Sequence, residues 1–296
     1  MCAWQAAQKV DDTAGFPFPA EKPFIVGPPI SHPKQFFGRK RETRRIFNFL
    51  SGLPFEHTAI VGLRRSGKTS LLNYVRQRPV TEPADLRPDQ VGATLPHPER
   101  YQTIFVDFQD PRMRSLPQLL QYFLCGMGGE APEGLELDEF MDLVAEPLSQ
   151  RPTIIIFDEL AAGLSSPSLD LSFWWAMRSM INLAGNGGLA FLIASSGDPA
   201  GLALENDKAS PFFNIFNTVQ LGPLTEAEAR DLINSSPIPV PADIQAWMLE
   251  KSGRWHSQLK WRADPRKCDC EQQFSCGRWR ITGSRRYSHA EECEHG

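Results

Sequence analysis

"GLRRSGKT", Gly62 to Thr69, places two glycines around a four-residue gap and follows the second with a lysine and a threonine. The β-branched run "HTAIVG" (57–62) ends at the first glycine. After the loop, apolar residues recur at helical spacing until Pro79, which ends the helix. Strand, glycine loop and helix therefore follow one another in the order that a phosphate-binding loop requires.

The residue types of this loop suit a nucleotide's phosphates. Gly62 and Gly67 let the backbone turn so that successive N–H groups point inward, assisted by the helix N-terminus. Lys68 would neutralise the β and γ phosphates, and the Thr69 hydroxyl would bind Mg²⁺. An ordinary glycine turn is the alternative. The residues expected to contact the nucleotide here are Gly62, Leu63, Arg64, Arg65, Ser66, Gly67, Lys68, Thr69 and Ser70.

A pair of acids follows a buried strand further along the chain. In "TIIIFDEL" (153–160) the apolar run is followed by Asp158 and Glu159. Together with the loop, Asp158 is expected to hold Mg²⁺ through its water shell, and Glu159 to orient or deprotonate the attacking water. Lys68 and Glu159 are thus candidate catalytic residues, and Thr69 and Asp158 candidate metal ligands. Alternatively, Glu159 caps the next helix.

Two serines end the next buried strand, "GLAFLIASSGD" (188–198). Ser195 or Ser196 could bond the γ phosphate or the attacking water, which makes both candidate catalytic residues. Serine is also a common turn residue after a strand, so a purely structural role stays open.

Strands and helices alternate through the rest of the chain, with another strand over residues 101–109. This pattern predicts an α/β fold, a five-stranded parallel sheet with helices on both faces and its ligand at the carboxyl ends of the strands. We expect an extended lead-in over residues 1–35, a P-loop ATPase core over 36–221 and a partial helical lid over 222–253. In the lid, Thr225 and Glu228 form a capping box, and Gly253 ends the last helix.

Other nucleotide chemistries fit less well. A GTPase would have glycine three residues after Asp158, where this chain has Ala161, and "ENDKAS" does not match a guanine-reading Asn-Lys-x-Asp. Small-molecule kinases use the same loop but rarely pair it with Asp-Glu on a central strand. ATP with Mg²⁺ is therefore the favoured cofactor pair.

In this order, "FFGRKRE", "GLRRSGKTSLL", "IIIFDEL", "LAFLIASSG" and "LGPLTEAEARDLI" resemble the STAND-type branch of the AAA+ P-loop ATPases. The prokaryotic archaeal-type ATPase group is the most similar, and origin-recognition initiators are similar too. The resemblance covers residues 24–253. It implies that residues 24–39, with Arg39, lie near the adenine, that the nucleotide sits between core and lid, and that ATP binding and slow hydrolysis operate a switch.

Charged residues elsewhere give weaker indications. We interpret most of the arginines in "FFGRKRETRRIFNFL" (36–50) as a solvated face, and Arg178 as a candidate for contacting a neighbouring subunit's nucleotide. A formal net charge of -4 argues against general nucleic-acid binding but leaves room for a local basic patch. Nucleic acid is therefore a partner that the sequence does not support, whereas a protein partner or a homo-oligomer is expected.

The segment 254–296 departs from the resemblance. It lacks the expected Gly-x-Pro turn and winged helix, and little periodicity remains. We favour a disrupted reading frame near Gly253, against a zinc site or a basic binding arm. The zinc ligands would come from Cys268, Cys270, Cys276, His289, Cys293 and His295, whose spacing matches no paired knuckle.

The start of the chain has no charged-then-apolar signal layout, and the apolar runs are too short to span a bilayer. We therefore expect a cytoplasmic protein without a membrane partner. The function predicted overall is a slow, Mg²⁺-dependent ATPase switch. The alternatives are a nucleotide-binding interaction module with little turnover and a DNA-associated, initiator-like ATPase.

Overall fold

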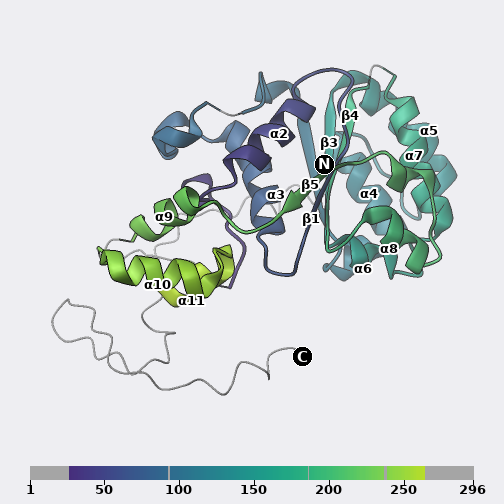
Figure 1. Ribbon diagram of the computed structural model, residues 1–296. Helices are drawn as coiled ribbons and strands as arrows, with labels where there is room; N and C mark the ends of the chain where they lie inside the picture. Colours follow the sequence, from purple (N-terminus) through teal and green to yellow (C-terminus); the bar gives the residue numbers. More distant parts are fainter. Residues whose placement is uncertain (1–26, 93, 186, 237–238, 264–296) are drawn as a thin grey trace, which may run out of the picture.

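The structure is a computed structural model that describes residues 27–263 except 93, 186, 237 and 238 (Figure 1). Within these residues it has a five-stranded sheet, helices on both faces and a small helical unit beside them. The strands are β1 (Thr58–Gly62), β2 (Gln102–Asp107), β3 (Thr153–Asp158), β4 (Leu189–Ser195) and β5 (Asn217–Leu221).

The α-helices are α2 (Lys40–Leu50), α3 (Lys68–Gln77), α4 (Leu116–Gly126), α5 (Leu137–Gln150), α6 (Leu160–Leu164), α7 (Leu171–Leu183), α8 (Pro199–Glu205), α9 (Glu226–Asn234), α10 (Ala242–Ser252) and α11 (His256–Ala263). Short 3₁₀ helices are η1 (Pro33–Gln35), η2 (Arg78–Val80), η3 (Pro83–Asp85), η4 (Pro88–Gln90), η5 (Pro98–Arg100), η6 (Pro111–Arg114) and η7 (Pro211–Asn214).

The sheet has the strand order β2-β3-β4-β1-β5, and all of its strand pairs are parallel. This confirms the predicted five-stranded parallel sheet. Because the strands are parallel, the loops after β1, β3 and β4 leave from the same edge. In register, Val61 of β1 pairs with Ser195 of β4, and Asp107 of β2 pairs with Asp158 of β3. The strand order thus places β4 between the phosphate loop and the paired acids.

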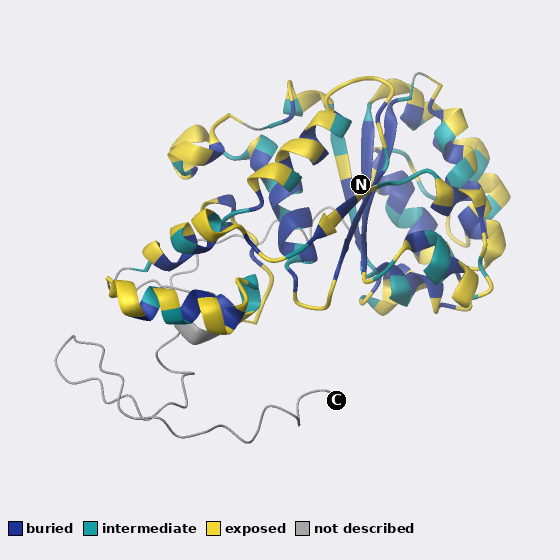
Figure 2. Ribbon diagram, in the orientation of Figure 1, coloured by how far each residue is buried: buried dark blue, intermediate teal, exposed yellow. Residues whose placement is uncertain are grey.

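Alternation along the strands divides the core into two layers. Ala59 and Val61 of β1 belong to the apolar cluster that includes α4, α5 and α7, whereas Ile60 between them joins the cluster with α2 and α3. Successive side chains point to opposite faces, so a continuous apolar run can serve both layers. Figure 2 shows the result as buried strands between helices whose outer faces are exposed.

The helical unit consists of α9, α10 and α11, which share an apolar cluster of their own. Thr225 and Glu228 form the predicted capping box at the start of α9. Gly253 ends α10 in the left-handed region, at φ 54°. The chain then begins α11, whose Leu259 is buried in the same cluster, so the unit extends past residue 253, where we expected it to end. An eight-residue helix carries too few apolar residues to show a clear period.

The helical unit meets the core through the turn before α2. Gly38 lies at φ 75°, and a Cβ there would come within 2.8 Å of Leu224 Cδ2 and 3.2 Å of Glu228 Cβ. Next to it, the backbone N–H of Lys40 donates to Glu228 Oε1 over 3.0 Å. Glu228 therefore caps its own helix and accepts a bond from the start of α2.

Gly38→Ala is expected to destabilise the protein by about 1–3 kcal/mol, because alanine is strained at positive φ and its methyl overlaps Leu224. Thermal unfolding of the purified variant measures the effect. Gly52→Ala is the matched control, since a Cβ at Gly52 meets nothing within 4 Å. Equal melting temperatures for the two variants would contradict the close approach of Leu224.

Among the described residues, no helix combines the length and apolar character needed to cross a bilayer. Of the lead-in expected over 1–35, the structure describes residues 27–35, which include η1. The zinc ligands suggested for the C-terminal segment, and residues 264–296 as a whole, lie outside the described residues.

Candidate functional site

The phosphate loop connects β1 to α3 at the carboxyl edge of the sheet. Gly67 lies at φ 96° and serves as N-cap of α3, so its conformation favours glycine. Gly62 is required for packing, because a Cβ there would lie 2.7 Å from Ser66 Oγ and 3.0 Å from Leu221 Cβ. Between the glycines, Leu63, Arg64 and Arg65 are exposed. The loop thus offers backbone N–H groups toward the space at the helix N-terminus.

Lys68 is buried at the first position of α3. Its Nζ donates to the carbonyl oxygens of Gly62 and Leu63, over 2.9 and 3.1 Å. Burial lowers the pKa of Lys68, while the nearby carboxylates of Glu159 and Asp158 act in the opposite direction. The ammonium therefore lies inside the loop, where phosphate oxygens could replace the two carbonyl acceptors.

Thr69, in the first turn of α3, lies beside Asp158, the last residue of β3. The Thr69 hydroxyl is hydrogen-bonded to the Asp158 carboxylate, whose Oδ1 also accepts the backbone N–H of Glu159. Burial raises the pKa of Asp158 to about 6, and repulsion from Asp107 and Glu159 adds to this, against the bond from Thr69. A divalent cation would remove the repulsion among these carboxylates, and Mg²⁺ commonly uses only one or two protein ligands. The Thr69–Asp158 pair fits that requirement.

Glu159 precedes α6 without capping it through its side chain. Its backbone lies in the left-handed region at φ 53°, which is strained for a side-chain-bearing residue. Although Glu159 is the N-cap of α6, its side chain makes no capping hydrogen bond. The alternative that the carboxylate caps α6 is therefore not what the structure shows. The strained backbone holds the residue beside Asp158 at the tip of β3.

The two serines after β4 differ. Ser195 is buried, and its hydroxyl donates to Gly197 O over 2.6 Å, which is the bond of a turn. Ser196 is exposed at the same edge. The Ser195 hydroxyl is thus already used in a turn, whereas the Ser196 side chain is accessible.

Arg39 lies against the phosphate loop. It is buried, its Nη2 donates to Ser66 O over 3.3 Å, and its Nη1 pairs with Glu42 over 3.0 Å. The Ser70 hydroxyl accepts the backbone N–H of Ile30 over 3.0 Å. Its side chain thus fastens the segment before η1, and only its backbone N–H, in the first turn of α3, remains for a phosphate.

The surroundings of the Ser66 hydroxyl indicate whether the loop can hold a phosphate group of a nucleotide. Its Oγ is buried and has no hydrogen-bond partner within the described part of the chain. An orphaned hydroxyl beside open N–H groups and a buried ammonium is typical of a site that is completed by an anion. The residues present therefore fit a phosphate group.

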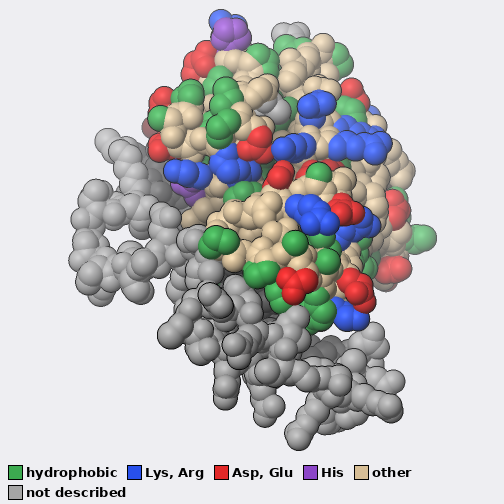
Figure 3. All heavy atoms as spheres, turned by 60° about the vertical axis from the view of Figure 1, so that its left-hand side comes forward, with side chains coloured by type: hydrophobic (Ala, Val, Ile, Leu, Met, Phe, Trp, Pro, Cys, Tyr) green, Lys and Arg blue, Asp and Glu red, His purple; other side chains and the backbone are tan. Residues whose placement is uncertain are grey.

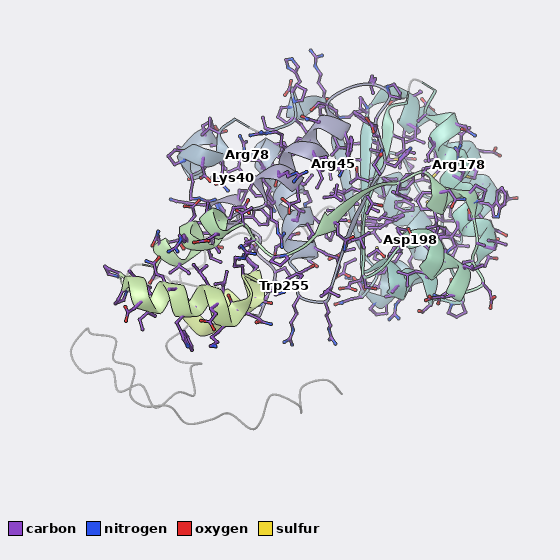
Figure 4. All side chains as sticks on the ribbon, in the orientation of Figure 1. Lys40, Arg45, Arg78, Arg178, Asp198 and Trp255 are labelled. Carbon is purple, nitrogen blue, oxygen red and sulfur yellow. The ribbon has the colours of Figure 1, made fainter. Side chains whose placement is uncertain are left out.

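Arg178 lies away from this site. Figure 4 places it on the opposite side of the sheet from Lys40. It donates to Asn182 on its own helix and lies close enough to help lower the pKa of His57 to about 4, after burial as the main cause. Since His57 precedes β1, Arg178 belongs to the amino edge of the strands.

One residue and one contact near the site were not predicted from the sequence. Asp107 pairs in register with Asp158 and lies close enough to repel it. The position of "VDFQD" at the end of a predicted strand could have identified it. The bond between Lys40 and Glu228 joins residues far apart in the sequence and has no local signal.

Neither a protein-family profile nor a curated protein sequence matches the chain. Several solved structures, in contrast, are similar to the chain in their fold. The chain is similar to the Walker-type ATPase PABY2304 of Pyrococcus abyssi, with a TM-score of 0.52 and 17% identity over 80% of this chain and 68% of that one. The fold is that of the AAA+ P-loop ATPases.

Two further solved structures are similar to the chain in their fold. The ORC2 protein of Aeropyrum pernix, in complexes with ADPNP and ADP, has a TM-score of 0.55 and 17% identity over 83% of this chain and 64% of that one. Cdc6p of Pyrobaculum aerophilum has a TM-score of 0.53 and 13% identity, over 79% of this chain and 62% of that one. This chain thus spans less than two thirds of the length of both.

The raised pKa of Asp158 predicts a pH effect on the stability of this α/β core without nucleotide. Between pH 3.8 and about 6 the folded state holds the proton more tightly than the unfolded chain, so the free energy of unfolding falls as the pH rises through this window. Across the whole window the free energy of unfolding falls by at most about 3 kcal/mol. Asp158→Asn should therefore melt at a higher temperature than the parent near neutral pH.

Thermal melts from about pH 4.5 to 7.5 measure this effect, and the two curves should converge at the acidic end. Asp142→Asn, at an exposed position on α5, is the control and should follow the parent throughout. A parent that is more stable than Asp158→Asn at neutral pH would contradict the buried-carboxylate interpretation.

Proposed function

We propose that this chain binds ATP with Mg²⁺ and hydrolyses it slowly, as a switch of the STAND type within the AAA+ fold. The observation that carries the proposal is the meeting of Lys68, the Thr69–Asp158 pair and Glu159 at one edge of the sheet. These groups supply the cation, the metal ligands and the base that phosphoryl transfer to water requires.

Each residue has a task that its surroundings support. Lys68, already buried inside the loop, would neutralise phosphate oxygens. Thr69 and Asp158 would hold Mg²⁺, which when bound supplies positive charge against the phosphate oxygens. Glu159 would orient the attacking water and accept its proton, and Ser196 would contribute a hydroxyl from the neighbouring strand.

A switch also needs a connection between the nucleotide and the rest of the molecule. Arg39 bonds the carbonyl of Ser66 in the loop, and the next residue, Lys40, bonds Glu228 of α9 through its backbone. A change in the position of Ser66 would therefore be transmitted through two successive residues to the helical unit. This contact supports nucleotide-dependent movement of α9 relative to the core.

ATP binding and phosphate release by the purified chain, with Mg²⁺ and with EDTA, test the function. We expect saturable binding and slow, Mg²⁺-dependent release of phosphate. A chain that binds no ATP under either condition would overturn the proposal.

Glu228→Ala is expected to weaken ATP binding by about fivefold to thirtyfold, because the loss of a helix cap and an interdomain bond costs about 1–2 kcal/mol. Titration with a fluorescent ATP analogue measures the affinity. Glu226→Ala is the matched control, since Glu226 on the same helix pairs with exposed Arg230 and not with the core. Equal affinities in the two variants would contradict a link through Glu228.

One observation favours a second candidate, nucleotide binding with little turnover. The buried serine at the end of β4, Ser195, uses its hydroxyl in a turn instead of directing it toward the phosphate loop. The same assay separates the two functions: binding without Mg²⁺-dependent phosphate release supports the second.

A further inference from the structure

A basic groove lies on the outer face of α2, outside the nucleotide site. It has a volume of about 420 Å³ and is lined by Lys40, Arg41, Arg44, Arg45, Asn48 and Glu228. The α2 residues recur at helical spacing on the face opposite the buried residues of the helix, Thr43, Ile46, Phe47 and Leu50. Figure 3 shows Lys and Arg side chains gathered in a band across this side of the molecule.

The charges at the two ends of the groove are already used. The Lys40 ammonium pairs with Asp89 and Asp231, over 3.1 and 3.9 Å. Glu228 accepts the Lys40 N–H and caps α9. These contacts hold Lys40 and Glu228 in place at the wall of the groove. The charged groups of the two residues already have partners, so neither is free to attract a ligand.

The three arginines are different. Within residues 27–263, apart from the four undescribed positions, no acidic side chain forms an ion pair with Arg41, Arg44 or Arg45. All three are exposed, and Arg45 is steadied over the ring of Phe49 at 5.3 Å. Adjacent like charges on one helix repel each other, so three unneutralised arginines are destabilising unless an anion joins them. The exposure of the three arginines agrees with the solvated face expected from the sequence, and the groove that they line is an additional feature.

The chemistry of the lining indicates the kind of anion. The groove residues are Lys, Arg, Asn and Glu, without an apolar side chain, whereas protein partners usually bury apolar anchors at the centre of an interface. Guanidinium groups match phosphate in a bidentate geometry, and the Asn48 amide adds a neutral donor. From Arg41 to Asn48 the helix rises about 10 Å, the axial length of about three nucleotides of one strand.

We propose that the groove formed by Arg41, Arg44, Arg45 and Asn48 binds the sugar–phosphate backbone of a nucleic acid, without reading its bases. The site is separate from the phosphate loop, and it adjoins Glu228, through which the core contacts the helical unit. The proposal goes beyond the ATPase function and does not depend on it.

Fluorescence anisotropy with a labelled DNA oligonucleotide, single-stranded in one arm and duplex in the other, tests the proposal. We expect binding that weakens steeply between about 50 and 200 mM salt. The arm with the higher affinity identifies the form of the backbone that the groove accepts. Absence of binding in both arms at low salt overturns the proposal.

A triple variant, Arg41→Ala, Arg44→Ala and Arg45→Ala, should lose on the order of a hundredfold in affinity near 0.1 M salt, and its salt slope should fall by about two to three. The matched control removes three arginines elsewhere, Arg100→Ala, Arg114→Ala and Arg178→Ala, and should bind within about twofold of the parent. Equal losses in the two variants would mean general charge attraction and overturn the site.

Two further measurements complete the test. The melting temperature and ATP binding of the groove variant should match those of the parent, because alanine favours the helix and none of the three arginines lies in the nucleotide site. Competition by poly-glutamate should be much weaker, per unit charge, than competition by unlabelled DNA. If poly-glutamate competed as strongly as DNA, the groove would be a site for an acidic protein. That result would overturn the proposal.

Discussion

Replacing Lys68 with alanine is expected to lower the affinity for ATP by at least about a hundredfold. Two charge-assisted hydrogen bonds to phosphate oxygens contribute about 1.5–3 kcal/mol each, and the ammonium is already inside the loop. The variant also removes two bonds to loop carbonyls, so its melting temperature should be recorded together with the affinity. Titration of a fluorescent ATP analogue gives the affinity directly.

The control for this variant is Lys251→Ala. Lys251 lies on α10 and pairs with exposed Glu250, so its loss removes one positive charge without touching the loop. We expect parental affinity from the control. A Lys68→Ala variant that remains folded and binds ATP as the parent does would show that the loop does not hold the nucleotide.

Glu159→Gln is expected to preserve ATP binding and to reduce kcat by about 10²–10⁴-fold, which is the usual contribution of a general base. Glutamine keeps the shape and the left-handed backbone position of Glu159 but cannot accept the proton of water. Single-turnover phosphate release measures the rate, and binding is measured in parallel. Loss of binding together with turnover would instead assign Glu159 a structural role.

Glu139→Gln, on the exposed face of α5, provides the same chemical change away from the site. Its turnover should equal that of the parent. If the Glu159→Gln variant also turns ATP over at the parental rate, another group activates the water, and Asp107, beside Asp158, becomes the next residue to replace.

The features predicted from the sequence were those with a local pattern. The glycine spacing around 62–69 and the buried strand before Asp158 each lie within a few residues, and the structure places both at one edge of the sheet. β5 was not located, because its burial alternates and it lies at the edge of the sheet, so its sequence lacks the apolar run of β3.

Other features depend on residues far apart in the chain. Asp107 becomes relevant only once β2 pairs with β3, and the Lys40–Glu228 bond depends on how the helical unit docks. Ser70 was assigned to the nucleotide because it follows the loop, and no local pattern indicates that its hydroxyl accepts the N–H of Ile30. Sequence spacing gives the order of such residues and not the direction of their side chains.

The position of β1 inside the sheet has a consequence for synthesis on the ribosome. Its partners are β4, which begins at Leu189, and β5, which begins at Asn217, whereas β1 itself ends at Gly62. The emerging chain carries the whole phosphate loop long before either neighbour exists, and contacts over such separations form slowly. Nascent chains that stop short of β4 should therefore leave both edges of β1 without their partner strands, and the proposed nucleotide site can form only after the central strands are complete.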